Sequence, residues 1–188
     1  MTAITSHALV PSDLRVVPSR DWHYFDALLR QPGLYEKLTD DATGKCGIIS
    51  LRDIVWNPKH HFLLVQSSDG SSTLRHGCFV FLVTRFGVYD AHVILQESCR
   101  GKNAVEAAKR AFSWMFDNTD AFQITTFCPD WLKASRVIAY AAGMRKCFRR
   151  EGMFEKNCRP AGATFYSLNF YEWIRLNDNG LNHTIQRN

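Results

Sequence analysis

The sequence predicts an α/β domain built around one mixed sheet, and three observations lead to this prediction. Apolar segments separated by turn residues at 62–66, 78–85 and 88–96 are typical of an antiparallel meander. Apolar residues at helical spacing follow in 103–116 and 131–142, with a strand-like run at 121–128 between them. This order indicates a central, mostly antiparallel sheet flanked by helices on both faces.

The length and composition favour a single domain. A chain of 188 residues with 46% hydrophobic and 13% aromatic residues is large enough to bury a core. We expect a flexible arm over 1–13, the domain over 14–174 and a polar tail over 175–188. The sequence has no membrane-length apolar run and no signal-peptide pattern, which predicts a cytoplasmic protein without a membrane partner.

The first third of the chain carries the weaker signals. Residues 14–17 are typical of a short strand, and Ser19 or Asp21 can cap a helix that ends before Pro32. A helical patch follows at 34–38. The next segment, 40–60, is first turn-rich and then apolar without a clean period, so no element is predicted there.

The rest of the chain gives clearer boundaries. Turns at 67–72 and at Phe86-Gly87 join the strands of the meander. Asp130 is expected to cap the helix over 131–142, which ends at Gly143. The last two strands are predicted at 148–154 and 164–171, with a loop at 158–162 and a frayed tail after Trp173.

One segment points to a ligand. The strand at 88–96 leads through the turn Arg100-Gly101-Lys102 into the alanine-rich helix. A helix N-terminus opened by such a turn presents unpaired N–H groups and the positive end of the helix dipole. Two cations are unfavourable there unless an anion is bound, so Arg100 and Lys102 are predicted to contact a phosphate of a cofactor.

Two local patterns resemble the GNAT superfamily of acyl-CoA-dependent N-acyltransferases, over about residues 76–171. The first is the turn at Arg100-Gly101-Lys102, in which Ser98 replaces the leading Gln or Arg and Asn103 replaces the second Gly. The second is the helix from Ser135 to the Gly143-Met144-Arg145 exit, with Met144 in place of the usual Phe. Asn tolerates positive φ and caps helices well, so the turn can keep its geometry at Asn103.

The resemblance implies a GNAT-like fold and acetyl-CoA as co-substrate. The backbone of the central strand would bind pantetheine and the turn would bind the phosphates. The residues expected to bind the cofactor are Ile94, Leu95, Gln96, Arg100, Gly101, Lys102, Asn103 and Ala104.

Three residues are candidates for catalysis. His92 lies on the strand that would flank the thioester and can act as a base toward an amine. The alternative interpretation of His92 is a half-buried strand residue whose ring is hydrogen-bonded to a neighbouring residue. Tyr140 and Ser135 are the candidate hydroxyl groups, although Tyr140 lies one position from where the family often has its general acid. Cys128 is expected to be a buried structural thiol rather than a nucleophile.

The cysteines and one histidine pair carry less information. The six cysteines lack metal-site or disulfide spacing, so no metal site is expected and small buried side chains are the favoured interpretation. Of the adjacent His60 and His61, at most one can line an acceptor groove, because neighbouring residues of a strand point in opposite directions.

These observations leave three functional hypotheses. The first is direct acetyl transfer in a ternary complex to an unidentified amine, on a small molecule or a protein. The second is a catalytically inactive GNAT-like structural or interaction protein, and the divergent motifs with a cysteine- and aromatic-rich composition suggest a bacteriophage origin. The third is nucleic-acid binding by a basic cluster in the last hairpin, which comprises Arg145, Lys146, Arg149, Arg150, Lys156 and Arg159.

Overall fold

The computed structural model describes residues 13–46, 50–69 and 72–185, and side chains only up to 178 in the last helix. Its strands form one sheet with the order β1-β2-β3-β4-β5-β7-β6. All neighbours are antiparallel except β4 and β5. The strands are β1 Arg15–Pro18, β2 His61–Asp69, β3 Ser72–Arg85, β4 Val88–Leu95, β5 Gln123–Pro129, β6 Arg145–Lys156 and β7 Arg159–Asn169. The predicted mixed sheet and the meander are therefore confirmed.

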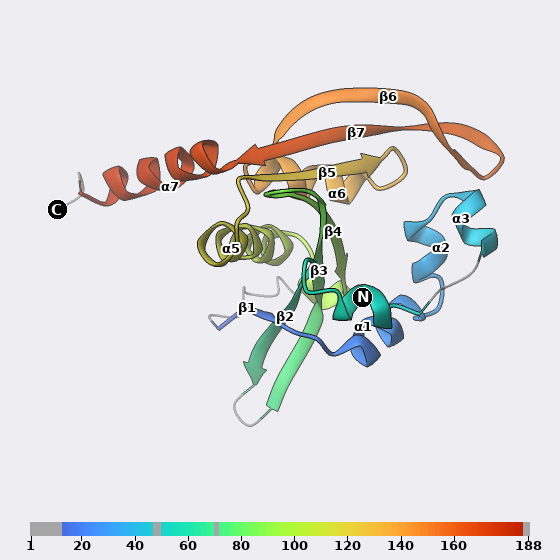
Figure 1. Cartoon of the computed structure of the whole chain (residues 1–188), viewed down its shortest axis with the longest axis horizontal. Coiled ribbons are helices and arrows are strands. Elements are labelled where there is room, and N and C mark those ends of the chain that lie inside the picture. The colour runs from blue at the N-terminus through green and yellow to red at the C-terminus, as the bar shows by residue number, and fades with distance from the viewer. Residues whose placement is uncertain (1–12, 47–49, 70–71, 186–188) are drawn as a thin grey trace, which may run out of the picture.

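Helices lie on both faces of the sheet, as the sequence predicted (Figure 1). The two faces are covered unequally, because one carries the long helix and the other only short helices. The helices are α1 Trp22–Leu29, α2 Leu34–Leu38, α3 Asp41–Cys46, α4 Arg52–Trp56, α5 Lys102–Asn118, α6 Lys133–Ala141 and α7 Phe170–Ile185, with a short 3-10 helix, η1, at Glu97–Cys99. None of the helices in these described ranges has both the length and the apolar character needed to cross a bilayer.

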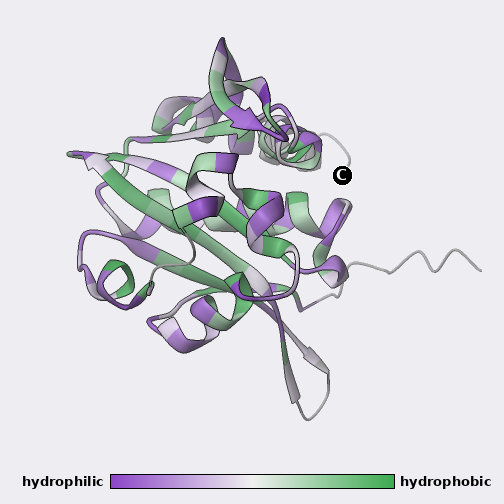
Figure 2. Cartoon of the chain, turned by 90° about the vertical axis from the view of Figure 1, so that its right-hand side faces the viewer, coloured by the Kyte–Doolittle hydropathy of each residue, from purple (hydrophilic) through white to green (hydrophobic). Residues whose placement is uncertain are grey.

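Two apolar clusters fix these helices to the sheet. Alanines and Phe112 of α5 pack with Tyr89 and Ala91 of β4 and Ile124 of β5 on one face. On the other face, α1 and α4 pack against β2 and β3 through Phe25 and other buried residues. Figure 2 shows the apolar colour concentrated along the central strands and the helix surfaces turned toward them. Small alanine side chains let α5 approach the sheet closely, which sets where its N-terminus lies relative to β4.

The sheet opens between β4 and β5. The two strands pair in parallel from Val88–Gln123 to Asp90–Thr125 and then separate. Beyond Asp90, β4 stays paired with β3 as far as Leu95, and β5 stays paired with β7 as far as Pro129. The edge of β4 that faces β5 therefore has no strand partner over its second half.

Several boundaries differ from the sequence-based prediction. The predicted turn at 67–72 is shorter, because β2 runs to Asp69 and β3 begins at Ser72. The turn-rich segment 40–47 contains α3, at whose start the Asp40 carboxylate accepts the Thr43 N–H at 2.7 Å. The unassigned region before β2 contains α4. The first twelve residues of the expected arm lie outside the described residues.

The C-terminal region differs most. The predicted strand 164–171 ends at Asn169, and α7 extends from there away from the sheet (Figure 1). Asn169 and Glu172 cap this helix reciprocally, since each side chain accepts the other's backbone N–H at 2.9 and 3.0 Å. Trp173 then packs on Phe116 of α5 with ring centroids 5.9 Å apart. The frayed tail expected after Trp173 is thus helical as far as Ile185.

Asp130 does not cap α6, which begins after Leu132 without a side-chain cap. Its carboxylate instead accepts hydrogen bonds from Arg149 Nη2 at 2.6 Å and from the Gly162 N–H at 3.0 Å. The guanidinium of Arg149 holds the pKa of the Asp130 carboxyl below its usual value. Asp130 therefore ties the end of β5 to the last hairpin.

Among the glycines near this opening, we predict that adding a side chain at Gly77 lowers the free energy of unfolding most. It has φ +134°, and a Cβ there would lie 2.2 Å from the Ile94 carbonyl oxygen. Gly101 has φ +62°, but nothing lies within 4 Å of its Cβ position. In urea unfolding, we expect Gly77→Ala to lose about 3 kcal/mol or more and Gly101→Ala only about 1–2 kcal/mol. Equal losses would contradict the close approach.

Candidate functional site

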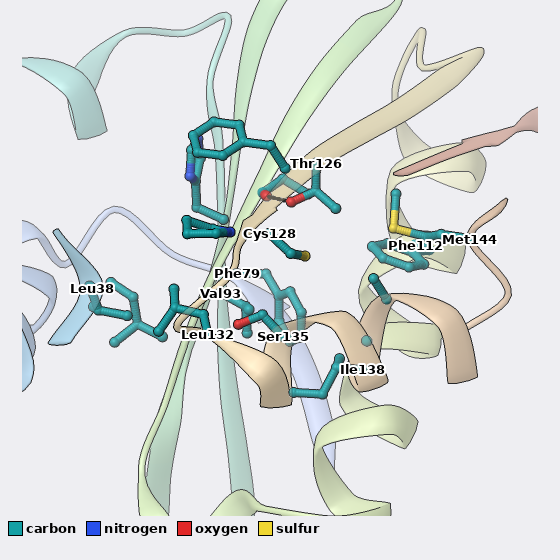
Figure 3. A pocket seen from close by; sticks show the side chains of 17 residues that line it. Leu38, Phe79, Val93, Phe112, Thr126, Cys128, Leu132, Ser135, Ile138 and Met144 are labelled. Atoms are coloured by element: carbon teal, nitrogen blue, oxygen red, sulfur yellow. Dashed lines mark hydrogen bonds between the residues drawn. The ribbon is translucent and has the colours of Figure 1, made fainter. Parts of the chain in front are cut away.

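A cavity of about 230 Å³ lies where β4 and β5 separate. Its wall is mostly apolar, and Figure 3 shows the side chains that surround it, with the Ser135 hydroxyl and the Cys128 thiol among them. The lining comes from β4, β5, α5 and α6, with Leu38 of α2 at one side. The opening seen in the strand pairing is therefore a real cavity bounded by both halves of the sheet.

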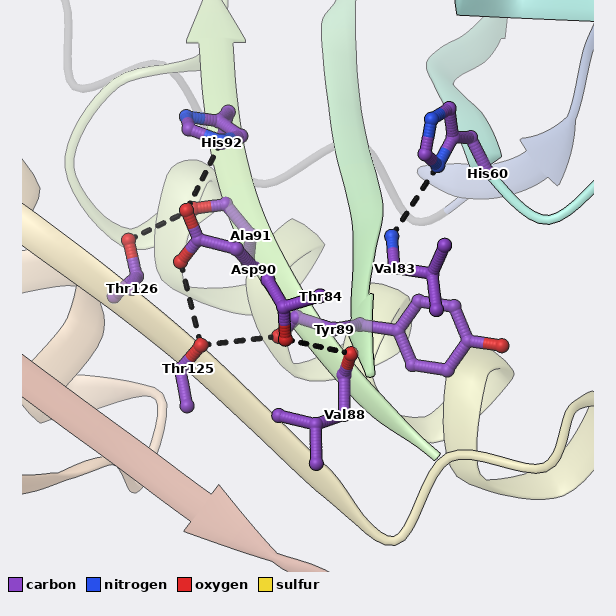
Figure 4. A network of polar contacts seen from close by, with 10 residues as sticks. All are labelled: His60, Val83, Thr84, Val88, Tyr89, Asp90, Ala91, His92, Thr125 and Thr126. Atoms are coloured by element: carbon purple, nitrogen blue, oxygen red, sulfur yellow. Dashed lines mark hydrogen bonds and ion pairs between the residues drawn. The ribbon is translucent and has the colours of Figure 1, made fainter. Parts of the chain in front are cut away.

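His92 lies on the cavity wall with a carboxylate beside it. Its Nε2 is 3.2 Å from Asp90 Oδ2, and its side chain is 41% exposed. Thr125 Oγ1 is 3.3 Å from the other Asp90 oxygen, and Thr126 donates its hydroxyl to the Ala91 carbonyl at 2.7 Å (Figure 4). Asp90 thereby holds the imidazole, and it was missed by the sequence analysis. The spacing contained the signal, since residues two apart on a strand point to the same face.

The other predicted catalytic residues are placed differently from one another. Ser135 lines the cavity together with Ile138 and Ala139 of the same helix. Tyr140 is 75% exposed, and the described cavity wall does not include it. Cys128 also lines the cavity, but burial raises the pKa of its thiol to about 11, so it is protonated at neutral pH. The structure brings His92 and Ser135 to one cavity and leaves Tyr140 on the surface.

The N-terminus of α5 is not capped by any side chain. Gly101 is the N-cap with φ 62°, and the first hydrogen bond of the helix runs from the Val105 N–H to the Gly101 carbonyl. The N–H groups of the three residues before Val105 therefore have no partner within the helix. The first turn contains no acidic residue, so the positive end of the dipole is not compensated there.

The turn residues differ in exposure and backbone conformation. Arg100 pairs with Glu97 at 2.9 Å, and both side chains are mostly exposed. Asn103 does not take the positive φ, which falls on Gly101 instead. It is the second residue of α5, with its side chain only 6% exposed, like the buried Ala104 beside it. Lys102 is exposed at the first position of the helix.

A buried histidine supports this turn from the neighbouring strand. The carbonyl of His76 in β3 accepts the Gln96 N–H at 2.8 Å. Its Nδ1 is 3.0 Å from Ser98 Oγ, and its Nε2 is 2.7 Å from Ser67 Oγ. His76 is 7% exposed, and burial lowers the pKa of its imidazole. One residue thus contacts both the N-cap and the middle of η1, the segment that leads into Arg100 and Gly101.

Other candidates from the sequence lie away from the cavity. His60 Nδ1 accepts the Val83 N–H at 3.2 Å (Figure 4), and the His61 ring packs near Tyr89 and Trp114. Neither lines this cavity, which agrees with the expectation that at most one of them could.

The cysteines do not all behave as small buried residues. Cys78, Cys99 and Cys128 are buried, but Cys46, Cys147 and Cys158 are exposed, and in the described chain all are free thiols. Asp41, Glu155 and Cys158 place ligand-type atoms within 4.8 Å of one another. The two Asp41 oxygens, however, accept the N–H groups of Asn157 and Cys158, so this group closes the hairpin turn.

Comparison with solved structures supports the fold. Spermidine N-acetyltransferase from Vibrio cholerae, in complex with CoA and spermine, superposes with a TM-score of 0.70 at 11% identity and covers 87% of this chain and 99% of its own. A putative phosphinothricin N-acetyltransferase superposes with a TM-score of 0.60 at 13% identity, covering 83% of this chain and 98% of its own. No curated protein matches the sequence.

These structures establish a GNAT fold for the chain, and their low identity carries no information on its substrate. A family profile adds a relationship at the sequence level. It matches residues 66–177, which include β3 to β7, the cavity lining except Leu38, and the turn before α5. The chain belongs to the family described as "Protein of unknown function (DUF2824)".

Proposed function

We propose that this protein is an N-acetyltransferase that moves an acetyl group from acetyl-CoA directly to an amine in a ternary complex. The observation that carries the proposal is that three features meet at one place. They are the unpaired edge of β4, the uncapped N-terminus of α5 and the His92–Asp90 pair on the cavity wall.

The residues present suit an acyl-CoA. The free edge of β4 offers the backbone groups of Val93 and Leu95 to the amide-like pantetheine arm, whereas those of Ile94 point toward β3. The Gln96 N–H donates to the His76 carbonyl and the Gln96 carbonyl accepts the Cys99 N–H at 3.0 Å, so both backbone groups of Gln96 are already engaged. The free N–H groups of Lys102, Asn103 and Ala104, with the Lys102 ammonium, suit the phosphates. Bound there, the thioester of acetyl-CoA supplies the activated acyl group.

His92 is the group that accepts the amine proton. If Nε2–H donates to Asp90, Nδ1 carries the lone pair and becomes the acceptor. Among the described residues nothing contacts this nitrogen, so it is available to an amine in the cavity. Backbone N–H groups along the β4 edge can stabilise negative charge on the carbonyl oxygen. Ser135 is the hydroxyl on the wall that can return a proton to the departing sulfur.

The phosphate contact is tested by titration calorimetry with CoA and acetyl-CoA. We expect micromolar binding that weakens about tenfold or more in Lys102→Glu, because a carboxylate would occupy the anion position. Lys109→Glu on the exposed side of the same helix makes the same charge change as a control and should bind normally. Absence of heat up to millimolar CoA in folded protein would overturn the transferase and favour a GNAT-like scaffold.

His76 is predicted to act as a positioning residue for the cofactor turn. Asn at this position can keep a nitrogen near Ser98, whereas Gln extends toward Ser67 and loses the Ser98 contact. His76→Asn should lower the melting temperature more than His76→Gln, because it leaves the buried Ser67 hydroxyl unpaired, whereas Ser98 is exposed. Only His76→Gln should also weaken CoA binding, by about fivefold to tenfold. Equal CoA affinities in the two variants would show that His76 supports the fold alone.

The role of His92 is tested by release of free CoA thiol with a panel of amines. We expect His92→Gln to lower kcat by about 10²-fold or more with CoA affinity unchanged, which is typical of a lost general base. Asp90→Asn should lower kcat less, because the imidazole remains but loses its orienting carboxylate. A kcat unaffected by His92→Gln, with an altered KM for the amine, would assign His92 to acceptor binding instead.

A further inference from the structure

An open face of the sheet continues from the cavity. Paired residues of neighbouring strands point to the same face, so the register places Thr125 and Phe127 of β5, Phe165 of β7 and Phe148 of β6 on the side opposite α5. On this side the apolar cluster of α1 and α4 involves residues of β1, β2, β3 and β4. The middle of β5, β7 and β6 therefore lies outside this cluster, while α2 and α3 contact the far end of the hairpin, where Lys156 donates to the Glu36 and Thr39 carbonyls.

Aromatic rings connect this surface to His92. The Phe127 ring lies 6.1 Å from the His92 ring, 6.0 Å from Phe165 and 5.8 Å from Phe154. Phe165 in turn stacks on Phe148 at 4.4 Å. We call these four phenylalanines, Phe127, Phe148, Phe154 and Phe165, the aromatic face. Phe127 also lines the cavity, so the aromatic face begins where the amine would enter.

Cationic side chains without partners surround the aromatic face. Arg85 lines a hollow of about 330 Å³ together with Phe148 and Phe165. In the backbone register of the hairpin, Arg150 lies opposite Ala163 and Arg159 lies opposite Lys156. Both arginine side chains therefore project to the same side as the phenylalanines. Among the described residues, no carboxylate lies within 4.0 Å of any of these three arginines.

Most carboxylates of the surrounding elements are engaged. Glu155 of β6 has no ion-pair partner among the described residues, but it alternates with Phe154 and Lys156 and so projects to the other side of the hairpin. Asp90 contacts His92, Glu172 contacts Arg145, and Asp41 accepts two backbone N–H groups. A linear polycation would therefore find one engaged carboxylate at the cavity and free guanidinium groups beyond it. Repulsion between like charges disfavours such an acceptor, whereas aspartate and glutamate side chains can pair with the arginines in bidentate geometry.

We propose that the acceptor is an acidic polypeptide. Its lysine or N-terminal amine enters the cavity beside His92, while apolar and acidic residues next to it contact the aromatic face and Arg85, Arg150 and Arg159. This inference rests on the proposed function, since it names the acceptor of the same site. During transfer, the amine nitrogen forms the amide bond and the thioester C–S bond breaks. The amine proton passes through His92 and the Ser135 hydroxyl to the departing CoA sulfur.

A nucleic acid fits the same surface less well. The phenylalanines stack on one another, and the Trp131 ring meets Phe154 edge-on and is covered by Lys156. They do not form a row of free ring faces on which successive bases could stack. The amino groups of the bases are also conjugated with their rings and are weak nucleophiles, unlike a lysine amine.

The proposal is tested with peptides that contain one lysine flanked by glutamates, by serines or by arginines. We expect kcat/KM, measured as thiol release, to be at least about tenfold higher for the glutamate peptide than for the arginine peptide. Arg150→Glu should remove most of this preference without changing CoA affinity. Lys109→Glu on the opposite face makes the same charge change and should retain it.

Binding of the same peptides to the CoA-loaded protein, followed by fluorescence anisotropy, separates this inference from the proposed function. Tight binding of the glutamate peptide without acetyl transfer would support the peptide-binding surface and contradict the proposed acetyltransferase activity. Preference for the arginine peptide or for spermidine would overturn the acidic acceptor. The acidic acceptor would also be contradicted if an oligonucleotide displaced the glutamate peptide at a lower concentration than the peptide itself. A third contradicting result would be a dimer, seen by sedimentation, that the Arg150→Glu variant no longer forms.

Discussion

The early end of the parallel pairing between β4 and β5 is the constraint on which the site depends. Each strand keeps its other neighbour after the separation, β3 for β4 and β7 for β5, so the sheet remains intact on both sides. The cost is a β4 edge with unpaired backbone groups, one of which, the Ala91 carbonyl, is satisfied by the Thr126 hydroxyl. The same separation creates the cavity between the two halves, so the binding edge and the reaction space have one structural origin.

The rest of the site is a consequence of what packs around that opening. Small alanine side chains bring α5 close to the sheet, which places its uncapped N-terminus near the end of β4. His76 holds the intervening turn through one backbone and one side-chain contact. A rigid turn is required there, because a helix dipole acts on an anion only within the first turn of the helix. The positive charge at α5 and the free arginines of the hairpin therefore serve two different anionic partners in the proposed complex.

Much of the fold could be predicted from the spacing of apolar residues. The site depended instead on short local residue patterns and on contacts set by strand register. The meander, α5, β5 and α6 followed directly from apolar spacing and turn residues. The pairing of Asp90 with His92 and the Asn169–Glu172 cap were present as local patterns and were overlooked. Tyr140 could have been excluded, because a helix that turns Ser135, Ile138 and Ala139 to the cavity rotates the next residue about 100° away. The contact of His76 with Ser98 joins residues 22 positions apart and follows only from the register of β3 with β4.

Charge is the property in which this chain can differ from its structural neighbours without changing the fold. At 11% identity, the spermidine N-acetyltransferase shares the backbone arrangement, and the side chains beside the cavity are free to differ. A polyamine needs carboxylates spaced along its path, and in the described part of this chain the proposed acceptor side carries Asp90 and three arginines without ion-pair partners instead. In the proposed complex, the opening between β4 and β5 is kept for acyl-CoA and the last hairpin selects the acceptor. Because β6 lies at the edge of the sheet, its side chains can change with little effect on the core, which makes it a suitable place for this selection.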